Sequence, residues 1–250
     1  MSKLILVANW KNYPNSLPEA KALLKELSKK KALFSKTTLF IAPPAPYMEL
    51  VANSFAKLAS QDLFPTEKGA HTGTVSVEML KSFGTKVAIL GHSERRALGE
   101  SSRDVAVKVK TALKAGITPL VCVGELVKDA EGEHFEFLRE EIKASLTGVS
   151  KKDVEKIMLA YEPVWAIGKS AKDVINPGEL SQTTLFMRKV LSDLFGRSAA
   201  EKVSILYGGS VEPKNVSDLM TGGVRGMLVG HASLNAKSFV GIVEAIFENK

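Results

Sequence analysis

Short runs of apolar residues alternate along the chain with longer segments in which apolar positions recur every three or four residues. Apolar runs without polar alternation are typical of strands in a parallel sheet, because both faces of such a strand are covered. Segments with a three- or four-residue period predict amphipathic helices. The predicted strands are residues 4–8, 37–42, 57–61, 87–91, 118–123, 157–161, 203–207 and 227–229. The predicted helices are residues 17–27, 48–55, 77–83, 105–114, 135–146, 179–195, 216–220 and 236–247.

Eight strands that alternate with helices predict a parallel α/β sheet. Eight such units in 250 residues fit one closed (β/α)8 barrel, so we predict a single domain over residues 1–250. A doubly wound open sheet is the alternative. No glycine-rich turn follows the first predicted strand, where a dinucleotide-binding sheet would carry one, and this favours the closed barrel.

Composition narrows the class of protein. Hydrophobic residues make up 45% of the chain and charged residues 24%, which is typical of a globular protein, and no apolar run approaches the ~18 residues of a membrane span. The one cysteine, Cys122, stands between Val121 and Val123, so we predict an inert buried thiol and a cytosolic protein.

The net charge of +7 is spread over scattered lysines. We find neither an arginine-rich arm nor the ligand spacing of a zinc site, and therefore predict no nucleic-acid partner. The basic surface is interpreted as a solvated one that attracts small anions.

Polar residues follow several of the predicted strands, at the end where (β/α)8 barrels carry their chemistry. Each has an ordinary structural explanation when taken alone, but closure of the barrel would bring all of them to one mouth. Glu162 ends a buried run and precedes Pro163, which cannot donate to a sheet, so its carboxylate is suited to general-base catalysis. The other polar residues at these ends are Asn9, Lys11, His92 and Glu94.

Glycines follow the last two predicted strands, in Gly208-Gly209-Ser210 and Gly230-His231. Their backbone N–H groups, with a short helix near Ser233, predict a phosphate site. A lysine, an imidazole and a carboxylate opposite this site would suit proton abstraction beside a carbonyl.

Four segments together resemble the triosephosphate isomerase family, in order over residues 7–234. They are Asn9-Trp10-Lys11, residues 91–96 (GHSERR), residues 160–168 (AYEPVWAIG) and Tyr207-Gly208-Gly209-Ser210. The resemblance implies interconversion of dihydroxyacetone phosphate and glyceraldehyde 3-phosphate, a step of glycolysis and gluconeogenesis, without metal or cofactor.

The resemblance also implies the role of each residue. Glu162 would be the base, a neutral His92 the electrophile and proton shuttle, and Lys11 the electrostatic stabiliser. Asn9 would position the substrate, with Glu94 and Ser93 in support. The N–H groups of Gly168, Ser210, Gly230 and His231 would hold the phosphate.

Three departures from the family pattern stand out. Lys169-Ser170-Ala171 replaces the usual continuation of the active-site lid, and His231 stands where the family has glycine. Residues 69–74 resemble the loop that reaches a partner subunit in a homodimer, with Thr72 at the contact, but Thr74 replaces a glutamate that would pair with an arginine such as Arg95. The changed lid and His231 keep open an alternative function, a catalytically silent barrel that binds phosphorylated metabolites.

Overall fold

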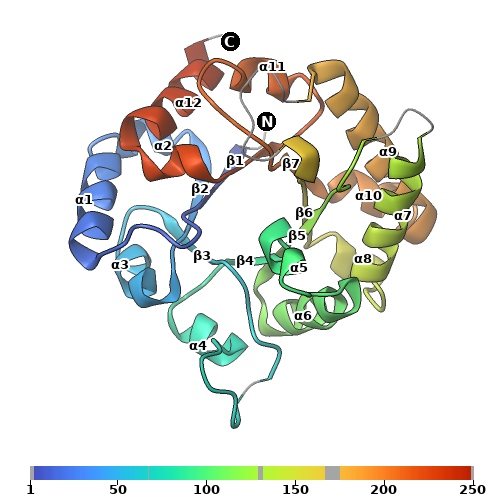
Figure 1. Cartoon of the computed structure of the whole chain (residues 1–250), viewed down its shortest axis with the longest axis horizontal. Coiled ribbons are helices and arrows are strands. Elements are labelled where there is room, and N and C mark those ends of the chain that lie inside the picture. The colour runs from blue at the N-terminus through green and yellow to red at the C-terminus, as the bar shows by residue number, and fades with distance from the viewer. Residues whose placement is uncertain (1–2, 67, 129–131, 167–174, 249–250) are drawn as a thin grey trace.

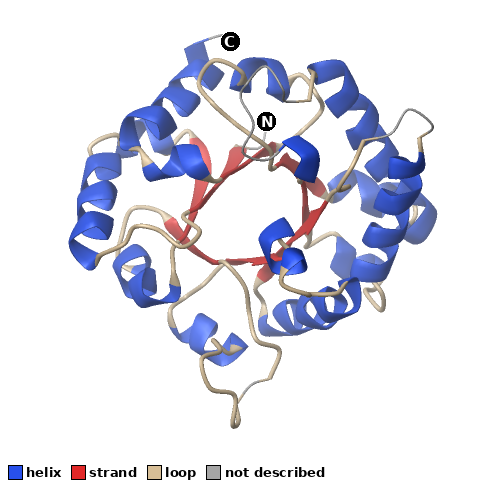
Figure 2. Cartoon of the chain, viewed as in Figure 1, coloured by secondary structure: helices blue, strands red, loops and turns tan. Residues whose placement is uncertain are grey.

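Eight parallel strands close into a barrel within a ring of helices in the computed structural model (Figures 1 and 2). The structure describes residues 3–66, 68–128, 132–166 and 175–248. Neighbouring strands pair in parallel in sequence order, and β1 returns to β8 with Ile5 opposite Gly226. The closed barrel is therefore confirmed and the open sheet is wrong. The strands are β1 (Leu4–Asn9), β2 (Thr37–Ala42), β3 (Lys57–Ser60), β4 (Val87–Leu90), β5 (Thr118–Val123), β6 (Met158–Tyr161), β7 (Ser204–Tyr207) and β8 (Gly226–Val229).

Helices connect the strands around the outside of the barrel (Figure 2). The helices are α1 (Leu17–Ser28), α2 (Lys31–Phe34), α3 (Met48–Ala52), α4 (Val77–Ser82), α5 (Ser93–Ala97), α6 (Ser102–Ala115), α7 (Glu133–Ser145), α8 (Lys151–Val154), α9 (Pro177–Phe195), α10 (Arg197–Lys202), α11 (Val216–Met220) and α12 (Ala236–Glu248). Short 3-10 turns are η1 (Ala45–Tyr47), η2 (Val164–Ala166) and η3 (His231–Leu234). The helices α2, α5, α8 and α10 were not predicted, because a helix of one turn or little more shows no periodicity.

The ends of two helices show how local sequence sets their limits. Ser16 caps α1 and accepts a hydrogen bond from the Glu19 N–H, but the Glu19 carboxylate accepts from the Asn15 N–H instead of closing a reciprocal capping box. Helix α6 ends at Gly116, whose φ of 76° is the left-handed conformation that a glycine adopts without strain. This helix therefore ends where the sequence predicts.

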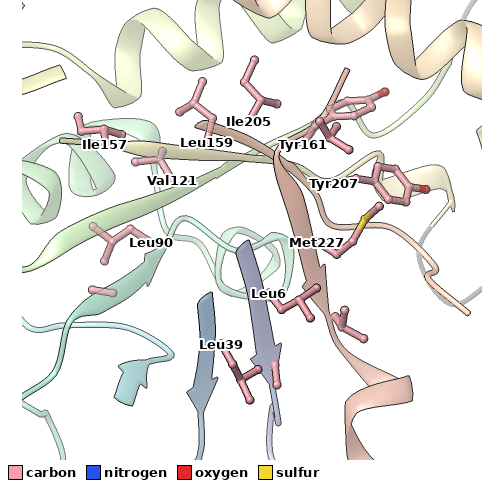
Figure 3. Packing of buried hydrophobic residues seen from close by; sticks show 14 of the residues in the cluster. Leu6, Leu39, Leu90, Val121, Ile157, Leu159, Tyr161, Ile205, Tyr207 and Met227 are labelled. Carbon is pink, nitrogen blue, oxygen red and sulfur yellow. The ribbon is translucent and has the colours of Figure 1, made fainter. Parts of the chain in front are cut away.

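Each strand contributes to two separate cores. Leu6, Leu39 and Leu90 point outward and pack with residues of the surrounding helices, as part of the cluster drawn in Figure 3. Their neighbours Val7 and Phe40 point inward and belong to a second cluster, made of strand residues that fill the barrel. Because successive side chains of a strand point to opposite faces, covering both faces removes the polar alternation. This is the physical reason that the apolar runs predicted the strands so well.

The connection between β3 and α4 extends away from the ring of helices (Figure 1). It contains Thr72 and Thr74, both of which are exposed in this chain. All eight strands run in the same direction, so their carboxyl ends meet at one mouth, where the polar residues singled out above lie.

Candidate active site

The mouth of the barrel holds a cavity of about 440 Å³. It is lined by residues at the ends of five different strands: Asn9, the last residue of β1, and Lys11 beyond it, His92 after β4, Glu162 after β6, Ser210 after β7 and Gly230 and His231 after β8. Barrel closure thus brings together side chains that are far apart in the sequence. Ser93 and Glu94 lie next to this group and contact its members. Gly168 and the lid residues Lys169-Ser170-Ala171 lie outside the described residues.

Glu162 lies directly after β6 and is only 2% exposed. Its N–H donates to the Val123 carbonyl at 2.8 Å, which extends the pairing with β5 by one residue. One carboxylate oxygen, Oε2, accepts from the Ser93 N–H at 3.1 Å. The other, Oε1, lies 3.2 Å from Nε2 of His92 but accepts no hydrogen bond from any described residue. The carboxylate is therefore anchored through one oxygen and keeps the other available.

Glycines let the neighbouring strands approach Glu162 closely. A Cβ on Gly208 would lie 2.7 Å from Cγ of Glu162, which no side chain could tolerate without displacing it. A Cβ on Gly124 would lie 1.9 Å from the Glu162 carbonyl oxygen. The sequence drew attention to Gly208 as part of a phosphate loop, but its tightest contact is with the carboxylate.

His92 lies at the amino end of α5 and is 7% exposed. Its Nδ1 accepts a hydrogen bond from the Glu94 N–H at 3.2 Å. An acceptor nitrogen must carry a lone pair, so the imidazole is neutral and has its proton on Nε2. His92 therefore presents an N–H donor to the cavity, next to the free oxygen of Glu162.

Lys11 has a φ of 51°, the single positive φ of a non-glycine residue among those described. Side chains on either side hold this conformation. Its N–H donates to Oδ1 of Asn9 at 3.0 Å, and the Gln61 amide donates to its carbonyl at 2.6 Å. The Lys11 ammonium lies 2.6 Å from Oε1 of Glu94, and a Cβ on Gly230 would meet Cε of the lysine at 3.1 Å. Strain of this kind persists where the surroundings over-determine a conformation, as they do in many active sites.

Gln61 was not predicted as part of the site, because it was assigned to the end of the third strand. The structure ends β3 at Ser60, and the Gln61 amide also donates to the Ala42 carbonyl at 3.0 Å. Its place at the carboxyl end of a strand is the signal that could have identified it.

The opposite side of the cavity presents backbone donors. Among the described residues, the N–H groups of Gly209, Ser210 and Gly230 donate a hydrogen bond to no acceptor. The Ser210 hydroxyl donates to the Ala166 carbonyl at 3.2 Å, while Ser233 is buried and its hydroxyl donates to the Gly230 carbonyl at 2.7 Å. These bonds fix the two loops and leave their N–H groups free for an anionic ligand.

A second residue that the sequence reasoning missed is Glu125, which is buried just after β5. Its Oε1 accepts from the Tyr161 hydroxyl at 2.8 Å and from Nε1 of Trp165 at 2.6 Å, and its carbonyl accepts from the Val164 N–H. Burial, and next the negative charge of Glu125, raises the pKa of Tyr161. Glu125 thus anchors η2, the segment from Val164 to Ala166 that leads out of the site.

A buried ion pair supports the end of β5 from outside the barrel. Oε2 of Glu141 accepts from the Gly124 N–H at 2.8 Å, and Nε of Arg96 lies 3.3 Å from its Oε1. Burial raises the pKa of Glu141, against the effect of Arg96, which lowers it. The predicted burial of Cys122 is confirmed, and burial together with the charge of Glu162 raises its pKa well above the usual range.

The described residues contain no group of three or more His, Cys, Asp or Glu side chains placed to hold a metal ion. Within the same part of the chain, no helix is both long and apolar enough to cross a membrane.

The fold and the cavity define the class: this is a (β/α)8-barrel enzyme with acid–base groups at the carboxyl ends of its strands. Comparison with known proteins identifies the family. Residues 4–246 match the family description "Triosephosphate isomerase". The chain belongs to the triosephosphate isomerase family.

Curated relatives agree over nearly the whole length. The triosephosphate isomerase of Fusobacterium nucleatum is 39% identical over 98% of this chain and 99% of the relative. The triosephosphate isomerase of Citrifermentans bemidjiense is 40% identical over 97% of this chain and 98% of the relative. That of Geobacter metallireducens is 41% identical over 96% of this chain and 97% of the relative.

Proposed function

We propose that this chain interconverts dihydroxyacetone phosphate and glyceraldehyde 3-phosphate, with Glu162 as the base, His92 as the acid and Lys11 as the stabilising cation. The observation that carries the proposal is the close contact between Glu162 and His92. The free oxygen of Glu162 lies 3.2 Å from Nε2 of a neutral His92, in a cavity that Lys11 also lines. Family membership supports a role of the reaction in glycolysis, and a role in gluconeogenesis belongs to the same proposal.

Proton transfer follows from the positions of these two groups. Glu162 takes a proton from the carbon beside the carbonyl, and the electrons of that C–H bond form a double bond between the two carbons. The carbonyl oxygen takes the proton that His92 carries on Nε2, which gives an enediol. Glu162 then returns the first proton to the adjacent carbon, while the hydroxyl on the first carbon gives its proton to His92 and becomes the new carbonyl. The former carbonyl oxygen keeps its proton as a hydroxyl, which completes the isomerisation, as is described for triosephosphate isomerases in general. No step is assigned to a metal or a cofactor.

Charge stabilisation is the role proposed for Lys11. Negative charge develops on the substrate oxygen as the proton leaves carbon, and a fixed ammonium is most effective in a site from which water is excluded. Glu94 and Asn9 hold the lysine from two sides, which supports their roles as positioning residues.

The phosphate is assigned to the loops after β7 and β8. The N–H groups of Ser210 and Gly230 have no acceptor among the described residues, which supports this assignment, and that of His231 belongs to the same proposal. The contribution of Gly168 stays a prediction from sequence.

The test of this function is a coupled isomerase assay on glyceraldehyde 3-phosphate with the native chain and Glu162→Gln. The amide keeps the size of the side chain but cannot take up a proton, so we expect kcat to fall by about 10²-fold or more. Glu201→Gln, at a surface ion pair with Arg197, serves as the control and is expected to leave kcat within about twofold. Near-normal turnover by folded Glu162→Gln would refute the assignment of the base.

The alternative is the catalytically silent barrel that binds phosphorylated metabolites. Its motivation is the changed lid and His231, and the intact arrangement of Lys11, His92 and Glu162 argues against it. Calorimetric binding of a phosphate ester by a chain that shows no turnover would favour it.

A homodimer is part of the same proposal. The connection between β3 and α4 extends from the barrel, and beside it lies a cavity of about 590 Å³ lined by Arg95, Leu98 and Lys108, with Leu98 82% exposed. Arg95 lies 3.0 Å from Asp62 of its own chain, so the loss of a glutamate at Thr74 does not leave this arginine unpaired. Sedimentation equilibrium at micromolar concentration tests the dimer, and a monomeric mass would overturn it.

We expect the protein in the cytosol.

A further inference from the structure

His231 is the first residue of η3 and lines the cavity together with Lys11 and Ser210. Its φ is not positive, so the residue occupies its position without the strain that glycine would relieve. The side chain is exposed, and it makes no hydrogen bond or ion pair with any residue that the structure describes. His231 thus lines the cavity, and its ring has no partner among the described residues.

The other charged groups around this part of the cavity already have partners. Lys11 is paired with Glu94 at 2.6 Å, and Glu212, which lines the cavity on the β7 side, is paired with Lys214 at 2.8 Å. The other titratable groups that line it are His92 and Glu162, which contact each other. Among the described lining residues that can carry a positive charge, His231 is therefore the one without a carboxylate partner.

We infer that the imidazole of His231 binds the phosphate group of the substrate, and that its protonated form makes affinity for the phosphate rise as pH falls. This inference rests on the proposed function, since it places the phosphate at the loops after β7 and β8. A histidine side chain changes its charge between about pH 5 and pH 8, and the positive form both donates two hydrogen bonds and attracts a dianion. Backbone N–H groups keep the same charge at every pH, so a glycine at this position would give no such dependence.

Sulfate is a suitable probe, because it remains a dianion over this range whereas a phosphate ester takes up a proton near pH 6. Its inhibition constant against glyceraldehyde 3-phosphate is measured at about pH 6 and about pH 8 for the native chain, His231→Gly and His231→Gln. For the native chain, we expect the inhibition constant of sulfate to be about three- to fivefold lower at the lower pH, after division by the change seen in His231→Gly. This factor is the size of one partly exposed charge contact. His231→Gln keeps a donor without a charge and should follow the glycine variant in its pH dependence.

The ratio of native to variant removes any pH dependence that comes from groups shared by all three proteins. Equal pH dependence in the native chain and His231→Gly, with matching melting temperatures, would overturn the inference. Should the chain show no turnover, the proposed function fails separately, and titration calorimetry with sulfate still tests His231. In that experiment, the heat that is lost in Lys11→Met is the heat of sulfate binding in the cavity. If the ratio of sulfate affinities of the native chain and His231→Gly does not change with pH, the inference is again refuted.

Discussion

The two sides of the barrel mouth are built in different ways. On the side formed by β1, β4 and β6 lie the side chains that we propose for the chemistry, and other groups fix each of them: the Ser93 N–H holds Glu162, the Glu94 N–H holds His92, and Asn9 holds the backbone of Lys11. On the side formed by the loops after β7 and β8, the groups that we propose for the phosphate are backbone N–H donors.

This difference predicts how each side responds to substitution. Side chains that act on the reacting atoms stabilise the transition state, so their loss lowers kcat. Backbone donors remain when a side chain is changed. Contacts to the unreactive phosphate act in the ground state as well as in the transition state, so substitutions in the loops after β7 and β8 should change mainly KM. A position such as 231 can therefore change its residue while the site keeps its donors.

The largest effect within this comparison is expected for Lys11→Met. The methionine keeps the unbranched stem but removes the charge opposite the developing oxyanion, so kcat should fall by about 10²- to 10³-fold, or about 3–4 kcal/mol of transition-state stabilisation. Steady-state kinetics measure the change.

Lys202→Met is the matched control for this substitution, because Lys202 pairs with Glu155 on the surface. It should leave kcat within about twofold. A Lys11→Met protein that changes KM alone would show that the lysine only holds the phosphate, and the distinction between the two sides of the mouth would fail.

The strands were predictable because burial on both faces removes polar alternation. The assignment of the phosphate to the glycine loops after β7 and β8 stays a prediction. The bonds that hold the catalytic groups were not predictable, since backbone donors such as the Ser93 N–H leave no trace in the identity of the residue. Glu125 was not predicted for another reason. It begins a run of mixed charged residues, and burial against Tyr161 and Trp165 depends on contacts that only the folded barrel creates.

An intermediate effect is expected for Gly208→Ala, which tests whether the phosphate side also positions the base. The new methyl group would lie 2.7 Å from Cγ of Glu162 and must push it aside, so we expect kcat to fall about 10- to 100-fold while KM changes little. Gly241→Ala is the control, because its methyl group meets only Cγ of Pro213, at 3.1 Å, on the outer ring. If Gly208→Ala raised KM alone, the glycine would serve the phosphate only.

The smallest effect is expected for Ser210→Ala, because the substitution leaves the N–H group of residue 210 in place. It removes the hydroxyl bond to the Ala166 carbonyl, which has a length of 3.2 Å and ties the β7 loop to η2. A slightly looser loop should raise KM about two- to threefold, the size of one weak hydrogen bond. Ser82→Ala removes a comparable bond, to the Met79 carbonyl at 2.7 Å, on the surface away from the mouth, and should leave KM unchanged. A fall of kcat beyond about tenfold in Ser210→Ala would mean that the phosphate side takes part in the chemical step, and the two sides of the mouth would then act as one unit.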